Sequence, residues 1–385
     1  MKKLKHFLLL IINLSLCMSL DANTTSRNQS YNEYRGDTKE EIIHLDTPDS
    51  YTVLLDSVKE DKSILLKSNN FGESWTYFKM PNFNAEYSRT IASKANPEKL
   101  YFAAYDDSDE DGKLFSYDKD RKYWEELHSF ENFNAINSIQ VDPLNEQVLY
   151  YISLYAPYYD DTVYDFSIRK SADGGKSWTN IENEISDTKY EPNKLVISKS
   201  NSDILYSYSP FSIFKTENGG QNWMKMFLDR PKEKVIHSLH INPKNPEQIF
   251  QVYSDRQSCS YHYSYDYYEC KYSIKKSDDS GKNWDEISLS ENTFDHISFD
   301  INSNGAVIFA LDDNRIPHYY ISTNEGQSFK EIKSEFKYFG TLSDYPKIIK
   351  INEANDIILA GTNSLDIGKI YNDTLHVYSS EIRNQ

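Results

Sequence analysis

Short runs of alternating apolar and polar residues, joined by turns rich in Asn and Pro, recur along the chain. In the clearest copies, Ile139–Tyr150 and Leu239–Phe250, two such runs flank a turn that contains Pro143 or Pro243. Alternation with a period of two is typical of β-strands that bury one face, and Pro and Asn favour the turn between them. Counting further copies, seven starts are separated by 44 to 58 residues, near Ile42, Ile91, Ile139, Leu195, Leu239, Ile297 and Ile348.

A second pattern lies between these copies: Ser or Thr, any, Asp or Asn, any, Gly, any, any, Trp or Phe. The carboxylate or amide is expected to accept backbone N–H groups in a turn, the glycine to take a positive φ, and the aromatic ring to pack between units. Five copies place these three side chains at Asn70, Gly72 and Trp75; Asp173, Gly175 and Trp178; Asn218, Gly220 and Trp223; Asp279, Gly281 and Trp284; and Asn324, Gly326 and Phe329.

Each unit is therefore expected to form four short antiparallel strands, since no helical periodicity separates the runs. A four-stranded sheet of this kind cannot bury both of its faces alone, so neighbouring sheets must stack and the row must close into a ring. The predicted fold class is all-β. We expect a single β-propeller of seven four-stranded blades over residues 41–385, with six or eight blades as alternatives.

The glycine-bearing turn resembles the Asp-box, or bacterial neuraminidase (BNR) repeat, of sialidases, sortilin-type receptors, xyloglucanases and photosystem assembly factors. The resemblance covers roughly Ile42 to Tyr378. It implies a propeller in which the boxes serve the architecture and the active site lies on the opposite face. The connections between the second and third strands of each blade, and between blades, are then expected to carry the function.

The first 22 residues read as a signal peptide, because three lysines precede the apolar stretch Phe7–Leu20, which is too short to span a bilayer. Residues 23–40 form a polar leader. Leu14-Ser15-Leu16-Cys17 also resembles a loose lipobox, so lipid attachment at Cys17 is an alternative to cleavage. We therefore expect a secreted or cell-surface protein without a transmembrane span, and a monomer.

The net charge of the chain bears on its binding partners, and its cysteine content predicts a disulfide. Among the 385 residues, 42 Lys and Arg stand against 59 Asp and Glu, and the net charge of -17 opposes binding to nucleic acid. Once Cys17 is set aside, Cys259 and Cys270 are the remaining cysteines, and a disulfide between them suits an exported protein.

Two long connections expected on the functional face are rich in tyrosine. Rigid aromatic side chains on a disulfide-tied loop suit the recognition of a peptide or a sugar, because little entropy is lost on binding. The alternative is a loop that only covers a sheet edge. The candidate ligand contacts are Tyr155, Tyr158 and Tyr159 in one connection and Tyr261, Tyr263, Tyr265 and Tyr267 in the other, which runs from Ser254 to Lys271.

Another acidic connection offers oxygen ligands at Asp107, Asp109 and Asp111 and is a candidate site for Ca²⁺, although the segment lacks the spacing of an EF-hand. No other cofactor is expected. Sialidases bind a substrate carboxylate with three arginines, and the candidates for that role are Arg89, Arg230, Arg256 and Arg315. In sialidases, however, the Arg-Ile-Pro motif precedes the first box, whereas here Arg315-Ile316-Pro317 lies in the sixth unit.

The sequence thus favours an exported propeller that binds a protein or glycan ligand through Tyr-rich loops, without catalysis. One alternative is an exo-acting glycoside hydrolase of the sialidase type. The other is an assembly factor for an exported complex.

Overall fold

The computed structural model describes most of the chain from residue 41 onward. The described residues are 41–49, 51–59, 62–81, 88–106, 111–130, 135–155, 165–182, 185, 192–226, 234–262, 267–287, 289, 293–294, 296–313, 316–334, 348–360, 365–371 and 374–379. The expected signal peptide and polar leader lie outside them. None of the described residues belongs to a helix that could span a bilayer.

The described residues form 28 β-strands. The first two sheets contain β1 (Glu41–Asp46), β2 (Val53–Lys59), β3 (Lys62–Ser68) and β4 (Thr76–Phe78), then β5 (Ser88–Ser93), β6 (Asn96–Asp106), β7 (Asp111–Asp118) and β8 (Tyr123–Phe130). The third contains β9 (Ala135–Asp142), β10 (Asn145–Tyr155), β11 (Asp165–Ser171) and β12 (Thr179–Asn180). The fourth contains β13 (Lys194–Ile197), β14 (Leu205–Ser209), β15 (Ser212–Thr216) and β16 (Met224–Lys225).

The fifth sheet contains β17 (Lys234–Ile241), β18 (Ile249–His262), β19 (Tyr267–Ser277) and β20 (Asp285–Ile287). The remaining strands are β21 (His296–Ile301), β22 (Val307–Asp313), β23 (Ile316–Ser322), β24 (Lys330–Ser334), β25 (Ile348–Ile351), β26 (Asp356–Ala360), β27 (Leu365–Tyr371) and β28 (Thr374–Ser379). These last eight strands form one continuous sheet.

The prediction of one propeller with seven separate four-stranded blades is wrong. The structure has five four-stranded sheets and one eight-stranded sheet, because β24 and β28 pair in parallel through Lys333 with Thr374 and Ser334 with Leu375. The two edge strands of the eight-stranded sheet, β21 and β25, also approach each other. Asn302 Nδ2, directly after β21, donates to the O atom of Asn352, directly after β25, at 2.7 Å. Ile351 N on β25 donates to Asp300 Oδ2 on β21 at 2.9 Å. The eight-stranded sheet therefore folds back on itself and is nearly closed.

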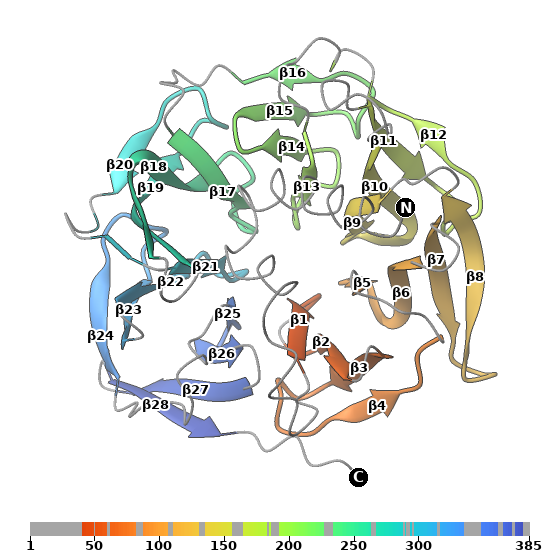
Figure 1. Cartoon of the computed structure of the whole chain (residues 1–385), viewed down its shortest axis with the longest axis horizontal. Coiled ribbons are helices and arrows are strands. Elements are labelled where there is room, and N and C mark those ends of the chain that lie inside the picture. The colour runs from red at the N-terminus through yellow and green to blue at the C-terminus, as the bar shows by residue number, and fades with distance from the viewer. Residues whose placement is uncertain are drawn as a thin grey trace.

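The sheets stand around a common centre, with the first strand of each four-stranded unit innermost (Figure 1). The beginning and the end of the described chain meet through side chains. Leu45 and Leu55 of the first sheet, with Phe71 of the turn between β3 and β4, pack with Ile358 and Leu365 of β26 and β27 in one buried cluster. Packing of apolar faces between neighbouring sheets therefore completes the ring, as the stacking argument requires.

Strands in the middle of the sheets are buried on both faces. All five residues of β14 and all five of β15 are buried.

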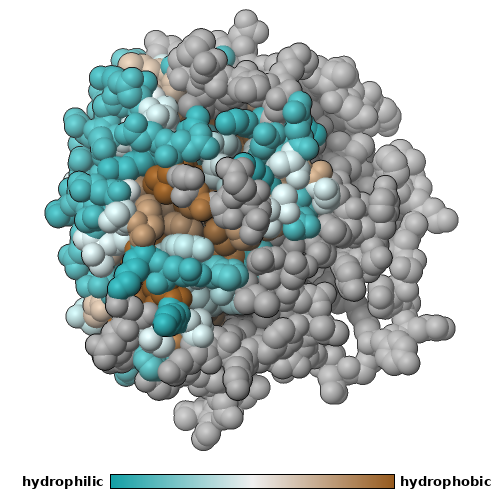
Figure 2. Space-filling view, turned by 90° about the vertical axis from the view of Figure 1, so that its left-hand side faces the viewer, coloured by the Kyte–Doolittle hydropathy of each residue, from teal (hydrophilic) through white to brown (hydrophobic). Residues whose placement is uncertain are grey.

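Between the fifth and the eight-stranded sheet the apolar core includes the half-buried residues Ile287, Tyr320 and Phe329. Figure 2 shows apolar surface enclosed by polar residues on the side of the molecule where β20 and β24 lie. The core thus reaches the surface at this seam.

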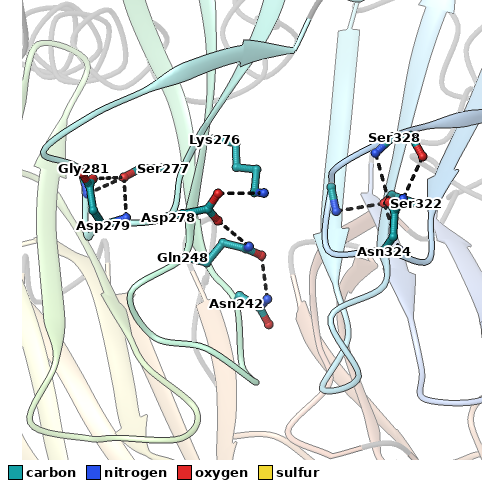
Figure 3. Close-up of polar contacts among 11 residues, drawn as sticks. Asn242, Gln248, Lys276, Ser277, Asp278, Asp279, Gly281, Ser322, Asn324 and Ser328 are labelled. Atoms are coloured by element: carbon teal, nitrogen blue, oxygen red, sulfur yellow. Dashed lines mark hydrogen bonds and ion pairs between the residues drawn. The ribbon is translucent and has the colours of Figure 1, made fainter.

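The glycine-bearing turns join the third and fourth strands of their units. In the fifth sheet, Ser277 Oγ donates to Asp279 Oδ1 at 2.8 Å and accepts from Gly281 N at 2.7 Å, and Asn283 N donates to Asp279 Oδ1 at 2.8 Å. Ser322, Asn324 and Gly326 repeat this arrangement in the next unit (Figure 3). The turn therefore satisfies its backbone donors with its own side chains.

Each of these turns also contacts the preceding sheet. Tyr101 is fully buried on β6, and its hydroxyl oxygen is 3.5 Å from the position that a Cβ on Gly174 would occupy. The hydroxyl oxygen of Tyr150 on β10 is 3.8 Å from the corresponding position on Gly219. Phe250 on β18 comes still closer to Gly326, with Cε1 at 2.6 Å from such a Cβ. The glycines thus serve contact between sheets as well as turn geometry.

Candidate functional site

The ring has two different ends. Backbone bonds connect the glycine-bearing turns to the turns after each first strand: Gly174 N donates to Gln147 O at 2.8 Å and Gly219 N to Asp203 O at 2.9 Å. We call this end the box end. The opposite end carries the connections from second to third strands and from one unit to the next, and we call it the loop face. Loops held by a rigid scaffold are where binding residues are concentrated.

A long β-hairpin is the most prominent feature of the loop face. Pairing between β18 and β19 continues from Ile249–Ser277 to His262–Tyr267, whereas the neighbouring strand β17 pairs with β18 only as far as Asp255. The residues beyond Asp255 therefore form a two-stranded extension of the fifth sheet, which we call the β18–β19 hairpin. Ser254–Lys271, expected to be a loop, is mostly strand, because its alternating residues pair across the connection.

Several contacts fix the base of this hairpin. The expected disulfide is confirmed: Cys259 and Cys270 are bonded, with their Cα atoms 4.1 Å apart. Buried Cys270 exchanges two backbone hydrogen bonds with Phe294, at 2.9 and 2.8 Å. Ser258 Oγ donates to Asp255 O at 2.6 Å and accepts from Lys271 N at 2.8 Å. The hairpin is thus held to the fifth sheet before any ligand arrives.

The tyrosines predicted as ligand contacts fall into two groups. Tyr155 ends β10 and pairs with Asp165, Tyr261 pairs with Tyr268, and Tyr267 pairs with His262. The structure therefore places the backbones of Tyr261 and Tyr267 on the two strands of the same hairpin. Tyr158, Tyr159, Tyr263 and Tyr265 lie outside the described residues.

The candidate arginines do not form a group among the residues described. Arg230 and Arg315 lie outside them. Arg256 is exposed on β18, whereas Arg89 lies on the innermost strand β5, on the other side of the ring (Figure 1). Burial lowers the pKa of Arg89, and the nearby Tyr208 and Asp56 partly oppose that shift.

Asp56 has partners of its own. It accepts hydrogen bonds from Thr90 N and Thr90 Oγ1, both at 2.6 Å, and one of its oxygens lies 3.1 Å from His44 Nδ1. Tyr208 is buried, and burial raises its pKa to about 12 although the Leu239 backbone and Arg89 oppose the shift. Arg89 thus interacts electrostatically with two buried groups of other strands, and it lies on a different sheet from Arg256.

Comparison with solved structures identifies the architecture. The GH74 xyloglucanase from Xanthomonas campestris aligns with 90% of this chain at a TM-score of 0.60 and 11% identity, and the match covers 56% of that chain. The structure of YCF48 bound to D1 peptide aligns with 86% at a TM-score of 0.54 and 12% identity, covering 93% of that chain. The β-propeller domain of the Trilobed protease from Pyrococcus furiosus aligns with 90% at 0.56 and 11%, covering 99%. The chain has the fold of a β-propeller.

Identities this low show the fold of the propeller and nothing finer. No protein-family model and no curated protein sequence matches the chain. The propeller spans 46% to 56% of the length of the GH74 enzymes that it resembles. Membership of the Asp-box family thus stays a prediction, although the turns have the hydrogen bonds described above.

The candidate calcium site is not tested by the described part of the propeller. Asp107 and Asp109 lie outside it, and Asp111 opens β7, where its backbone pairs with Asp106. Among the described residues, no group of three or more His, Cys, Asp or Glu side chains could hold a metal ion.

Sequence reasoning did not find the charged side chains of the innermost strands. His240 and Asp300 are two of these, each flanked by apolar residues in Leu239-His240-Ile241 and Phe299-Asp300-Ile301. A charged residue inside an otherwise apolar strand was the available signal. Alternation alone, however, does not tell whether that face meets solvent, a neighbouring sheet or the centre of the ring.

Proposed function

We propose that this propeller is exported and binds a protein or glycan ligand through its loop face, with the β18–β19 hairpin as the main contact element and without catalysis. The observation that carries the proposal is the hairpin itself, which extends past the sheet and is held by the Cys259–Cys270 disulfide. A preorganised aromatic surface loses less conformational entropy on binding than a flexible loop does. Its tyrosines are Tyr261, Tyr263, Tyr265, Tyr267 and Tyr268.

The similar solved structures support both ligand classes. One is a xyloglucanase, and another holds a D1 peptide. We therefore propose an oligosaccharide or a peptide as the ligand, and the mature chain from residue 23 as the binding species. The sialidase-type alternative needs three converging arginines, and the described Arg89 and Arg256 lie on opposite sides of the ring.

Replacing Tyr263 and Tyr267 together by Ala is expected to weaken ligand capture by about 10-fold or more, since buried aromatic anchors dominate binding energy. The measurement is binding of the mature protein to arrays of xyloglucan oligosaccharides and of peptides, followed by calorimetry on the best ligand. Tyr77→Ala is the matched control, because Tyr77 is a 60% exposed tyrosine on the outermost strand β4. Equal capture by the hairpin variant and the wild type would contradict the proposal.

Replacing both hairpin cysteines by Ser is expected to reduce affinity while the blades stay folded. The loop between the cysteines spans only 11 positions, so the bond restrains the hairpin rather than the ring. The fall should appear mainly as a larger entropic cost in calorimetry. If the thermal unfolding midpoint of the whole propeller collapsed instead, the disulfide would be a global element and this part of the proposal would fail.

A further inference from the structure

The outer edges of the sheets differ in length. The outer strands β4, β12, β16 and β20 contain three, two, two and three residues. β24 and β28, of five and six residues, pair with each other. β8 has eight residues, lies at the rim of the ring and pairs with β7 only (Figure 1). It is the longest outer strand, and none of the residues that the structure describes pairs with its outer edge.

The turn before β8 explains its length. This turn, between Asp118 and Tyr123, contains no glycine; Arg121 N donates to Asp118 Oδ1 at 2.9 Å, and Lys122 has a φ of +56°. Pairing starts directly at Asp118–Tyr123 and continues to Gly112–Phe130. In the five units with a glycine-bearing turn, the fourth strand pairs with the third over only two or three residues.

Neighbouring sheets hold β8 on both faces. Trp124 packs into the core shared with the first sheet, and its Nε1 donates to Lys79 O at 3.1 Å. Leu127 packs into the core shared with the third sheet, together with Trp178. The backbone of β8 is therefore fixed while its outer edge stays open. A peptide that adds to such an edge loses mainly its own conformational freedom on binding.

An open edge offers backbone N–H and C=O groups to another extended segment, and proteins usually shorten or cover such edges. The register of β8 shifts once, at Leu127, because Leu114 pairs with His128 and Phe115 with Glu126. The regular part of the edge is thus Tyr123–Glu126. This segment is where a strand can be added.

Two carboxylates flank this segment. Glu125 and Glu126 are exposed. The nearby Arg121 is paired with Asp118, with Nε 3.8 Å from Oδ2, and no lysine or arginine that the structure describes forms an ion pair with either glutamate. Because successive side chains of a strand point to opposite faces, the two glutamates place one carboxylate on each face beside the same edge.

We propose that β8 binds an extended basic peptide, which adds to the second sheet as a further strand and places two consecutive Lys or Arg residues opposite Glu125 and Glu126. Consecutive residues of the added strand also point to opposite faces, so both carboxylates gain a partner. A second copy of this chain fits this edge poorly, because it would bring the same two glutamates and a net charge of -17. The edge is separate from the loop face and its hairpin, which belongs to the fifth sheet.

Glu125→Gln with Glu126→Gln is expected to weaken peptide binding about 5-fold or more, because two pairs of opposite charge across the strands are lost. The test is calorimetry at low salt on the mature protein, with a synthetic peptide of Thr and Val around one Lys-Lys pair. Asp285→Asn with Glu286→Gln is the matched control. It removes two consecutive exposed carboxylates from the three-residue outer strand β20 and should bind like the wild type.

Strand addition is tested through the backbone of the peptide. Alternate residues of a strand direct their N–H groups to the same edge, so we compare two versions of the peptide, each N-methylated at one alternate set of residues. One version should lose binding, although both keep the Lys-Lys pair. Hydrogen–deuterium exchange should slow in Tyr123–Glu126 when the unmethylated peptide binds, and should not change in the β18–β19 hairpin.

The proposal is overturned if the wild type does not bind the peptide saturably, if the Gln variant binds it equally well, or if both methylated versions bind like the parent. Protection confined to the hairpin would place the peptide on the loop face and also overturn it. So would a wild-type dimer in sedimentation that the Gln variant strengthens, because the edge would then serve a second copy. Tyr263→Ala with Tyr267→Ala should bind this peptide like the wild type, so failure of β8 and failure of the hairpin are distinguishable.

Discussion

Replacing Gly220 by Ala is expected to lower the free energy of unfolding by about 2 to 5 kcal/mol, since a left-handed backbone and overpacking both act against the added methyl group. Gly220 has φ +91°, and a Cβ there would lie 2.4 Å from Ile181 Cδ1 and 3.2 Å from Ile181 Cβ. Ile181 cannot retreat easily, because its backbone O accepts from Trp223 Nε1 at 2.7 Å and its N donates to Ile168 O at 2.8 Å. Urea unfolding followed by circular dichroism measures the loss.

Gly305→Ala is the matched control for this prediction. Gly305 has a similar φ of +80°, but the nearest atom to a Cβ there is Glu325 Cγ at 2.9 Å, on a side chain that can move. We expect this variant to show only the backbone cost of about 1 to 2 kcal/mol. Equal losses at both positions would mean that contact between the third and fourth sheets adds nothing. Adding Ile181→Ala to Gly220→Ala should recover part of the loss if the clash is real.

Replacing Asp366 by Asn is expected to stabilise the protein at pH 8 by up to about 4 kcal/mol and to remove the loss of stability that this carboxyl causes as the pH rises from 4 to 7. Asp366 lies on β27 and is 3% exposed, and burial raises the pKa of its carboxyl to about 7. Its Oδ2 has no hydrogen-bond partner. Asp366 lies close enough to the buried Tyr319 to raise that residue's pKa, after burial itself and Asp312.

The sign of this effect follows from the two protonation states. Below about pH 4 the carboxyl is protonated in both the folded and unfolded chain, so it contributes nothing to the pH dependence. Between about pH 4 and 7 the unfolded chain releases the proton and the folded chain keeps it, so stability falls as the pH rises. Asn stays neutral throughout and avoids the cost of ionising a buried group.

The measurement is chemical denaturation of the wild type and Asp366→Asn at intervals from pH 4.5 to 8.5. Asp120→Asn, a change in an exposed turn, serves as the control and should leave the wild-type profile intact. An Asn variant that is less stable than the wild type at pH 8 would show that Asp366 is ionised and paired in the folded protein. The prediction would also be contradicted if the wild type and Asp366→Asn had the same free energy of unfolding at every pH.

Much of the fold could be predicted because its signals are local. Alternation in Ile139–Tyr150 and Leu239–Phe250 gave the strand pairs β9–β10 and β17–β18, since the side-chain period and the turn residues act over a few positions. The disulfide between Cys259 and Cys270 was predictable for a similar reason, because few cysteines remained to choose from.

Other features depend on how separate strands approach one another. The repeat spacing does not predict the parallel pairing of β24 with β28, because the residues along the edge of an outer strand do not indicate which other strand will pair with it. The candidate arginines show the same limit: Arg89 was predicted as a ligand contact, yet the structure places it beside Asp56 and Tyr208. Which residues of separate strands lie next to each other in the ring cannot be predicted from their separation in the sequence.

Hydrophobic period and turn chemistry are properties of short segments, so the strands, the glycine-bearing turns and the four-strand unit could be predicted from the amino-acid sequence alone. The three-dimensional arrangement was needed to show that the last two units share one sheet, that Asp366 is enclosed without a partner for its Oδ2, and that Lys199 contacts Thr47 across the ring. Burial and electrostatic coupling arise when distant segments exclude water together, and no single segment contains that information.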